Sequence, residues 1–299
     1  MTELEVIHQT RYRYPAPVSL AHHLAHLQPL QDADQRLAEF TLHIDPPPSA
    51  LVESLDRRGN VCRTFSVLGA HDSLSVKAHS RVQLRPRFAA LAPAASPPWE
   101  TVAERLRYVA RADFEPAVEF TMPSPYVARL QALRSVAVPS FPAGRPLALA
   151  ALDLMQRIHR DFAYVGQSTT VDTPLAQVLA QRSGVCQDFA HLMSGALRML
   201  GLPARYVSGY LLTRPPGGQT DLIGADASHA WVQVWCPDTP GMPADGWLDL
   251  DPTNDMVPDT GHVRLAVGRD YGDVTPLRGV IRGGGRHTLA VEVHTRMLS

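Results

Sequence analysis

The chain has 299 residues, of which 45% are hydrophobic and 19% are charged, and its formal net charge is −1. This length allows one large domain or two modest ones, each with a substantial core. The balanced charge gives no electrostatic footprint for nucleic acid or an anionic membrane, so neither is an expected partner. No apolar run reaches the ~18 residues that a membrane-spanning helix needs.

Cysteine usage indicates a reducing compartment. The three cysteines are Cys62, Cys186 and Cys236, and an odd, sparse count argues against a disulfide scaffold. The N-terminus shows neither the basic nor the apolar segment of a secretory signal peptide. We therefore expect a cytoplasmic protein, with Cys62 and Cys236 packed in strands. The oligomeric state is not predicted.

The first part of the chain predicts β structure. Apolar or amphipathic residues alternate with polar ones from Leu4 to Tyr14, and the same period of two recurs at 40–44, 61–67 and 74–84. A turn signal at 56–60 separates two of these stretches. We expect a β-sandwich-like domain over residues 1–90, joined to the rest of the chain by an Ala/Pro-rich stretch.

Residues 91–299 are expected to form a second, larger domain. Helical patterns interrupted by prolines cover 99–135, and apolar residues at helical spacing predict a helix from Arg145 to Arg160. Glycines at 283–285 predict a turn between two C-terminal strands. A phosphate-binding loop is not expected there, because the Lys-Ser/Thr pair of such loops is missing.

The segment around Cys186 is the most informative. A Ser183–Gly184 turn precedes it, an apolar stripe at helical spacing follows it, and Gly201 ends the pattern, so Cys186 lies at the start of a predicted helix. Free N–H groups and the helix dipole stabilise a thiolate there and can bind an oxyanion. A single cysteine is nevertheless more often a small packed residue.

Two later strands offer a base and an acid. His229 begins an alternating strand, on its more polar face, and imidazole is the usual base for a catalytic cysteine. The next strand places Asp249 and Asp251 on one face, and Pro252 ends it, which leaves Asp251 at the strand mouth. Each could be an ordinary structural residue. Together they form a nucleophile, a base and an orienting acid in chain order.

The chain resembles the bacterial transglutaminase-like superfamily. The resemblance rests on the segments GVCQDFAH at 184–191, GLPARYVSGY at 201–210, SHAW at 228–231 and WLDLDPTN at 247–254. Residues 268–279 fit the same bacterial subgroup, and 10–18 and 56–60 resemble its accessory N-terminal β domain. The match covers nearly the whole chain.

The resemblance implies a papain-like α+β core over about residues 146–280, in which the cysteine helix packs against an antiparallel sheet. Carried over by position, Cys186 is the nucleophile, His229 the base and Asp251 the orienting acid, while Asp249 receives no role. The backbone N–H of Cys186 is one expected oxyanion donor. The Tyr164 hydroxyl or the Gln187 side chain is a candidate for the second.

The implied reaction is acyl transfer from a peptide or protein amide through a thioester. Hydrolysis by a protease-like or amidase-like enzyme is the leading expectation. A protein-crosslinking transglutaminase and a non-catalytic binding scaffold are the alternatives. Thr169 and Thr170, in the loop before the cysteine helix, are candidates to line the substrate cleft.

No cofactor and no metal are expected. His22, His23 and His26 cluster, and the four-residue spacing of His22 and His26 would suit a metal site on a helix. Neither a carboxylate nor a cysteine accompanies them in the neighbouring sequence, and the segment is predicted to be β structure.

Overall fold

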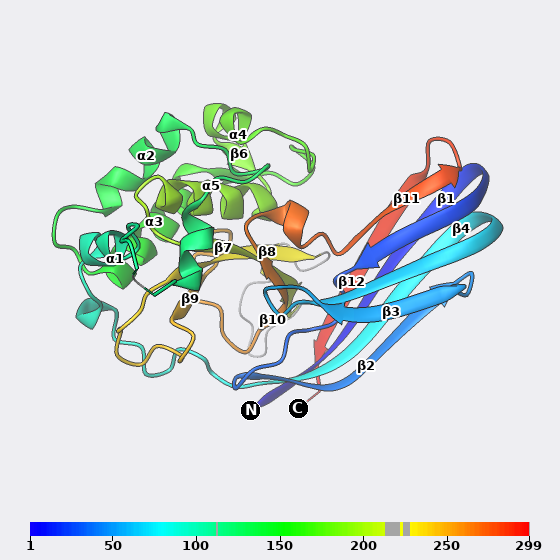
Figure 1. Cartoon of the computed structure of the whole chain (residues 1–299), viewed down its shortest axis with the longest axis horizontal. Coiled ribbons are helices and arrows are strands. Elements are labelled where there is room, and N and C mark those ends of the chain that lie inside the picture. The colour runs from blue at the N-terminus through cyan, green and yellow to red at the C-terminus, as the bar shows by residue number, and fades with distance from the viewer. Residues whose placement is uncertain (112, 213–221, 224–227, 299) are drawn as a thin grey trace.

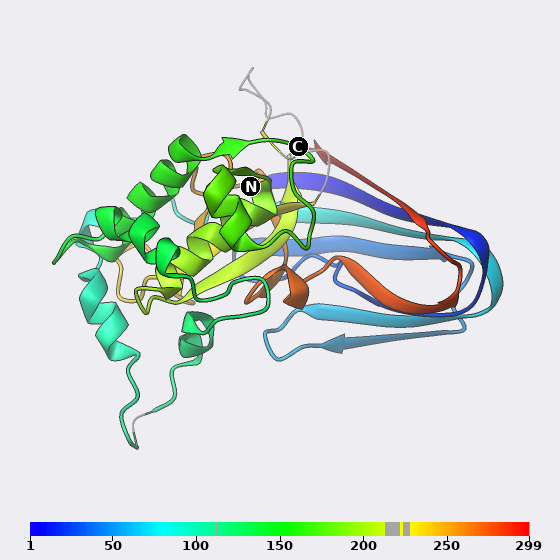
Figure 2. The ribbon, with the colours of Figure 1, turned by 90° about the horizontal axis from the view of Figure 1, so that it is seen from above.

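The computed structural model describes residues 1–111, 113–212, 222–223 and 228–298. The fold is α+β, with long antiparallel strands on one side and a helix-covered sheet on the other (Figure 1). Both ends of the chain lie close together, as two perpendicular views show (Figures 1 and 2). Within the described ranges, no helix has the length and apolar character needed to cross a membrane.

Two long strands organise the N-terminal domain. β1 (Thr2–Ala25) and β4 (Val61–Leu84) pair antiparallel, and their register shifts between Arg13 and Leu20. Figure 2 shows both strands turning back at the end of the molecule far from the helices. Each strand therefore contributes one half to each of two layers, which is how two strands can span a sandwich.

The remaining strands extend these two layers. β2 (Gln35–Asp45) pairs with the second half of β4, and β3 (Ala50–Leu55) pairs with its first half. The core between the layers contains Val18, Ala21, Phe65, Val67, Ile44, Leu74, Val76 and Ala78. Burial of alternate residues along β1 and β4 matches the period of two in the sequence. The sandwich-like prediction is thus confirmed.

The last two strands of the chain also belong to this sheet. β11 (Leu277–Gly283) pairs with the second half of β1, and β12 (Thr288–Met297) pairs with its first half. The predicted division near residue 90 places both strands in the second, larger domain, whereas the hydrogen bonds join them to the N-terminal domain. A period of two predicts a strand but does not identify a partner at the other end of the chain.

The larger region, which the resemblance predicts to be the catalytic one, is built on a four-stranded antiparallel sheet. Its order is β10 (His262–Gly268), β7 (Ala204–Leu211), β8 (His229–Trp235) and β9 (Trp247–Leu250). Helix α5 (Cys186–Arg198) packs against β7 and β8 (Figure 1). The start of α5, at Cys186, and the start of β8, at His229, therefore lie close together.

Three further helices pack on α5: α2 (Gln131–Ala137), α3 (Leu147–Asp161) and α4 (Leu175–Gln181). Helix α1 (Trp99–Arg105) packs on α3. The helix predicted at 145–160 is α3, and the helix predicted to begin at Cys186 is α5. Two-residue strands β5 (Ala163–Tyr164) and β6 (Ser183–Gly184) pair in parallel just before α5. Short 3₁₀ segments are Pro93–Ala95, Pro116–Thr121, Val138–Ser140 and Tyr271–Asp273.

The face of β8 that carries His229 is buried, contrary to its expected polar character. Every residue of β8 is buried, and Trp231 packs with Val207, Val267 and Leu30. Leu30 belongs to the segment between β1 and β2, so the N-terminal domain covers this face. Alternation along one strand cannot show that a second domain excludes water from its polar side.

Two buried side-chain amides join the domains at the edge of β10. Gln35 donates from Nε2 to the Arg264 carbonyl at 2.8 Å, and its Oε1 accepts from the Arg264 N–H at 2.8 Å. Asn60 makes the same pair of bonds with Val267, both at 2.8 Å. These amides form hydrogen bonds with backbone N–H and carbonyl groups at the edge of β10, where a neighbouring strand would otherwise pair.

Candidate active site

Cys186 is held at the first turn of α5 by a buried carboxylate. Asp188 Oδ2 accepts a hydrogen bond from the Val185 N–H at 2.9 Å and one from the Thr169 hydroxyl at 2.6 Å. Burial raises the pKa of Asp188, and these two hydrogen bonds oppose that shift. The turn before the helix, through Val185, and the preceding loop, through Thr169, both form hydrogen bonds with the Asp188 carboxylate. These bonds fix the position of Cys186.

Gly184 is required by this arrangement. A Cβ atom at that position would lie 2.6 Å from Asp188 Oδ2, which is far inside van der Waals contact. The Ser-Gly signal in the sequence therefore reflects a close approach between the turn and the Asp188 side chain. Cys186 itself is partly exposed, as a nucleophile that meets a substrate must be.

His229 and Asp251 form a buried pair beside Cys186. The His229 Nε2 atom lies 2.9 Å from Asp251 Oδ2, and both side chains are fully buried. The other ring nitrogen, Nδ1, is buried and has no hydrogen-bond partner among the described residues. Nδ1 is thus the nitrogen available to the thiol, while Nε2 is held by the carboxylate.

The electrostatics of this pair favour opposite charges. Burial alone would lower the pKa of His229, but the Asp251 carboxylate outweighs it and, with a contribution from Cys186, raises that pKa to about 10. Burial likewise opposes ionisation of Asp251, yet the His229 and His262 rings hold its pKa well below the usual range. At neutral pH the pair is an imidazolium and a carboxylate.

Sequence reasoning missed two further partners of Asp251. His262 Nε2, from the start of β10, lies 3.2 Å from Asp251 Oδ2, and Asn254 Nδ2 donates to the same oxygen at 2.8 Å. The other oxygen, Oδ1, accepts from the Thr253 N–H at 2.9 Å. Asn254 could have been suspected as a polar residue in the turn after Asp251. His262 carries no local signal, because only the pairing of β10 with β7 brings it here.

Asp249 lies on the same strand face but serves another purpose. Its Oδ1 accepts a hydrogen bond from the Trp231 indole N–H at 2.8 Å, and its Oδ2 is 3.3 Å from Arg87 Nε. The Trp231 ring in turn stacks on the His229 ring, with centroids 6.1 Å apart. Of the two acids on this face, Asp251 contacts the imidazole directly and Asp249 orients the aromatic ring beside it.

The four remaining candidates lie before or at the start of α5. Tyr164 pairs with Gly184 in the short β5–β6 ladder, and its ring packs edge-on against Phe189. Gln187 donates from its side chain to the Val171 carbonyl at 3.3 Å.

The two threonines differ in their contacts. Thr169 donates to Asp188, whereas Thr170 is exposed and its backbone N–H donates to Thr173 Oγ1. Thr169 thus supports the helix start.

The three ligand atoms of His229, Asp251 and His262 lie within 4.8 Å of one another, a spacing that could also hold a metal ion. Both Nε2 atoms are turned to one carboxylate oxygen, however. Because an ionised carboxylate only accepts hydrogen bonds, both Nε2 atoms carry a proton and offer no lone pair to a metal.

Two family models match this chain. The family model described as the bacterial transglutaminase-like N-terminal region matches residues 4–83, and that of the transglutaminase-like superfamily core matches residues 142–252. The second range includes Cys186, His229 and Asp251.

Similar proteins come from several bacteria. An uncharacterized protein of Mycobacterium tuberculosis is 41% identical over 278 residues, which are 92% of this chain and 86% of that one. A protein-glutamine gamma-glutamyltransferase of Pseudomonas aeruginosa is 36% identical over 118 residues, 38% of this chain and 17% of that one. A solved structure named as a putative cysteine protease from Cytophaga hutchinsonii covers the whole chain, and 91% of its own, with a TM-score of 0.73 and 21% identity. It shows the fold.

Proposed function

Because the chain belongs to the transglutaminase-like superfamily, we propose that it is a cysteine-dependent acyl-transfer enzyme acting on peptide or protein amides. The observation that carries this proposal is the His229–Asp251 pair beside Cys186. Its imidazolium lies next to a thiol at a helix start, and both the positive charge and the helix terminus favour a thiolate.

In the proposed reaction, Cys186 attacks the amide carbonyl carbon as the thiolate, with its proton already on His229, and the carbonyl electrons move onto oxygen. The backbone N–H groups at the start of α5 are suited to stabilise that oxyanion. When the tetrahedral intermediate collapses, the C–N bond breaks, and His229 gives the leaving nitrogen a proton from Nδ1. A thioester between Cys186 and the acyl group remains.

We propose water as the acceptor that resolves the thioester. The neutral His229 ring removes a proton from water, the hydroxide forms the new C–O bond, and the C–S bond breaks. Water needs no binding site of its own, which makes hydrolysis the leading proposal. The similarity to a protein-glutamine gamma-glutamyltransferase over 118 residues favours a second candidate, in which a primary amine takes the place of water.

A peptide mixture incubated with the enzyme, with and without a primary amine, tests both readings. Mass spectrometry distinguishes cleavage and deamidation from addition of the amine. We expect cleavage or deamidation that disappears in Cys186→Ala, while amine adducts would favour the transglutaminase reading. Products that persist unchanged in Cys186→Ala would refute the catalytic proposal, because they could not arise through this thiol.

A further inference from the structure

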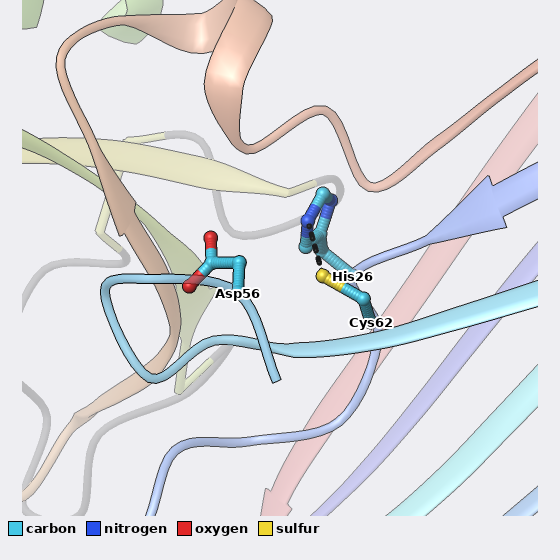
Figure 3. A group of neighbouring side chains, drawn as sticks. All are labelled: His26, Asp56 and Cys62. Atoms are coloured by element: carbon cyan, nitrogen blue, oxygen red, sulfur yellow. Dashed lines mark hydrogen bonds between the residues drawn. The ribbon is translucent and has the colours of Figure 1, made fainter. Parts of the chain in front are cut away.

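A second Cys-His-Asp group lies at the junction of the two domains, away from the candidate active site. Figure 3 shows the His26 ring and the Cys62 sulfur facing each other, with the Asp56 side chain next to them and its carboxylate oxygens turned away. His26 follows β1, Asp56 lies in the turn between β3 and β4, and Cys62 is the second residue of β4. One ligand atom of each lies within 4.8 Å of the others.

We propose that His26, Cys62 and Asp56 bind one zinc ion. Imidazole nitrogen, thiolate sulfur and carboxylate oxygen are the ligands that Zn²⁺ takes in proteins, at about 2.0–2.3 Å. Tetrahedral geometry with those bonds places two ligand atoms about 3.3–3.8 Å apart. The Cys62 Sγ–His26 Nε2 distance of 3.3 Å falls at this separation. With its turn hydrogen bonds in place, Asp56 presents an oxygen within 4.8 Å of the other two ligand atoms, and water would complete the tetrahedron.

The surrounding hydrogen bonds prepare these ligands for a metal. His26 Nδ1 lies 3.1 Å from the Thr275 carbonyl, which can only accept, so the proton resides on Nδ1 and Nε2 presents its lone pair. The Asn60 side chain donates to Asp56 Oδ2 at 2.7 Å and also to the Val267 carbonyl. Ligating histidines and carboxylates in metal sites are held by outer hydrogen bonds of this kind.

Burial argues for a metal site over a second nucleophile. Cys62 is 7% exposed and His26 is 3% exposed, so a polypeptide substrate has no access to the sulfur. Asp56 also does not contact the Nδ1 side of His26, where an orienting acid would lie. The β3–β4 hairpin supplies the cysteine and the carboxylate that are missing from the sequence around His22 and His26.

The position of the group suggests what the ion does. The His26 N–H donates to the Pro276 carbonyl at 2.9 Å, where the chain leaves the catalytic region for β11. Asn60 holds β10 of the catalytic sheet. All three ligands belong to the N-terminal domain, so an ion on them fixes the segments from which His26 and Asn60 contact the rest of the chain.

The test uses the full chain with Cys186→Ser as background, because Cys186 and His229 could themselves hold a thiophilic metal. Metal is removed with a chelator, and Zn²⁺ is titrated in competition with a chromophoric chelator. We expect one equivalent of Zn²⁺ and a higher melting temperature on binding. In parallel, Co²⁺ is expected to give the absorption of a tetrahedral site with a thiolate ligand.

Matched variants locate the ion. Cys62→Ser and His26→Gln are each expected to weaken Zn²⁺ binding by about 100-fold or more, and Asp56→Asn, which keeps the turn hydrogen bonds to Oδ1, by about 10–100-fold. Cys236→Ser and His22→Gln should bind as the background does. Circular dichroism of each metal-free variant verifies folding, and the thiolate absorption of Co²⁺ must vanish in Cys62→Ser alone.

The proposal is overturned if the folded background protein binds no stoichiometric Zn²⁺, which would leave Cys62 and His26 as a simple S–H···N hydrogen bond. It is also overturned if binding survives Cys62→Ser and His26→Gln but is lost in His262→Gln. That result would place the ion on the His229–Asp251–His262 group. Neither outcome depends on whether the enzyme acts on amides.

Discussion

Asp251 holds His229 through a 2.9 Å hydrogen bond between two side chains that water does not reach. The bond leaves Nδ1 of His229 available to Cys186, and the Asp251 carboxylate, with a contribution from Cys186, outweighs burial and raises the pKa of the ring to about 10. In the proposed reaction, this charged ring supplies the proton for the leaving group in the first half.

The pair should make stability depend on pH in a defined direction. His229 has a folded pKa of about 10 and an unfolded value near 6.5, so its contribution is complete below about 6.5 and is lost as the pH rises through about 10. Asp251, with its lowered pKa, contributes above about pH 4 and loses that contribution as the pH falls.

Urea unfolding of the wild type and His229→Gln tests this dependence. At pH 7 the variant should lose about 3–5 kcal/mol in the free energy of unfolding, because a buried carboxylate loses its charged partner. The difference should shrink at pH 10. A difference that stays constant from pH 7 to pH 10 would show that the two side chains do not form an ion pair.

His262 is predicted to be a positioning residue. It donates to the same Asp251 oxygen as His229, and its removal leaves that carboxylate less firmly oriented. His262→Ala should slow alkylation of Cys186 by iodoacetamide at pH 7 by about 10-fold. His262→Gln, which keeps an N–H donor, should recover part of the rate, and the exposed His43→Gln should have none of these effects. Equal rates in all three variants would remove His262 from the site.

Gly184→Ala should disturb the start of α5. The added Cβ would lie 2.6 Å from Asp188 Oδ2, so the capping carboxylate or the turn must move. We expect a loss of about 1–3 kcal/mol in unfolding free energy and slower labelling of Cys186. Gly166→Ala is the matched control, since nothing lies within 4 Å of its added Cβ. Similar behaviour of both variants would contradict the close-approach explanation.

Gln35→Ala should weaken the junction between the domains. It leaves the Arg264 N–H and carbonyl at the edge of β10 without their partner, at a cost of about 1–3 kcal/mol. Chemical denaturation measures the loss, and the exposed neighbour Gln31→Ala serves as the control. If Gln35→Ala is as stable as that control, the Gln35 amide does not stabilise the junction between the domains.

The sequence predicted the local elements well because their signals are local. The start of α5 has a turn, an apolar stripe and a glycine stop, and β1 and β4 show the period of two. The pairing of β11 and β12 with β1 was missed, because hydrophobic alternation does not identify a distant partner. The buried face of β8 was missed for a related reason, since the cover comes from Leu30 in the other domain.

The candidate site divides in the same way. Cys186, His229 and Asp251 each lie at the end of an element, where a local pattern and the family resemblance both point. His262 and Arg87 reach the site through tertiary structure alone, one through the pairing of β10 and the other from the segment after β4. The ligands proposed for zinc show the same limit, because His26 and Cys62 meet only when β1 and β4 pair.

The rate at which iodoacetamide alkylates Cys186 at neutral pH, followed by peptide mass spectrometry, tests the central claim most directly. If His229 activates this thiol, Cys186 should react faster than a free thiol such as glutathione, and His229→Gln should lower the rate by about 10²-fold or more. A Cys186 that reacts no faster than the free thiol, at a rate unchanged by His229→Gln, would contradict the account.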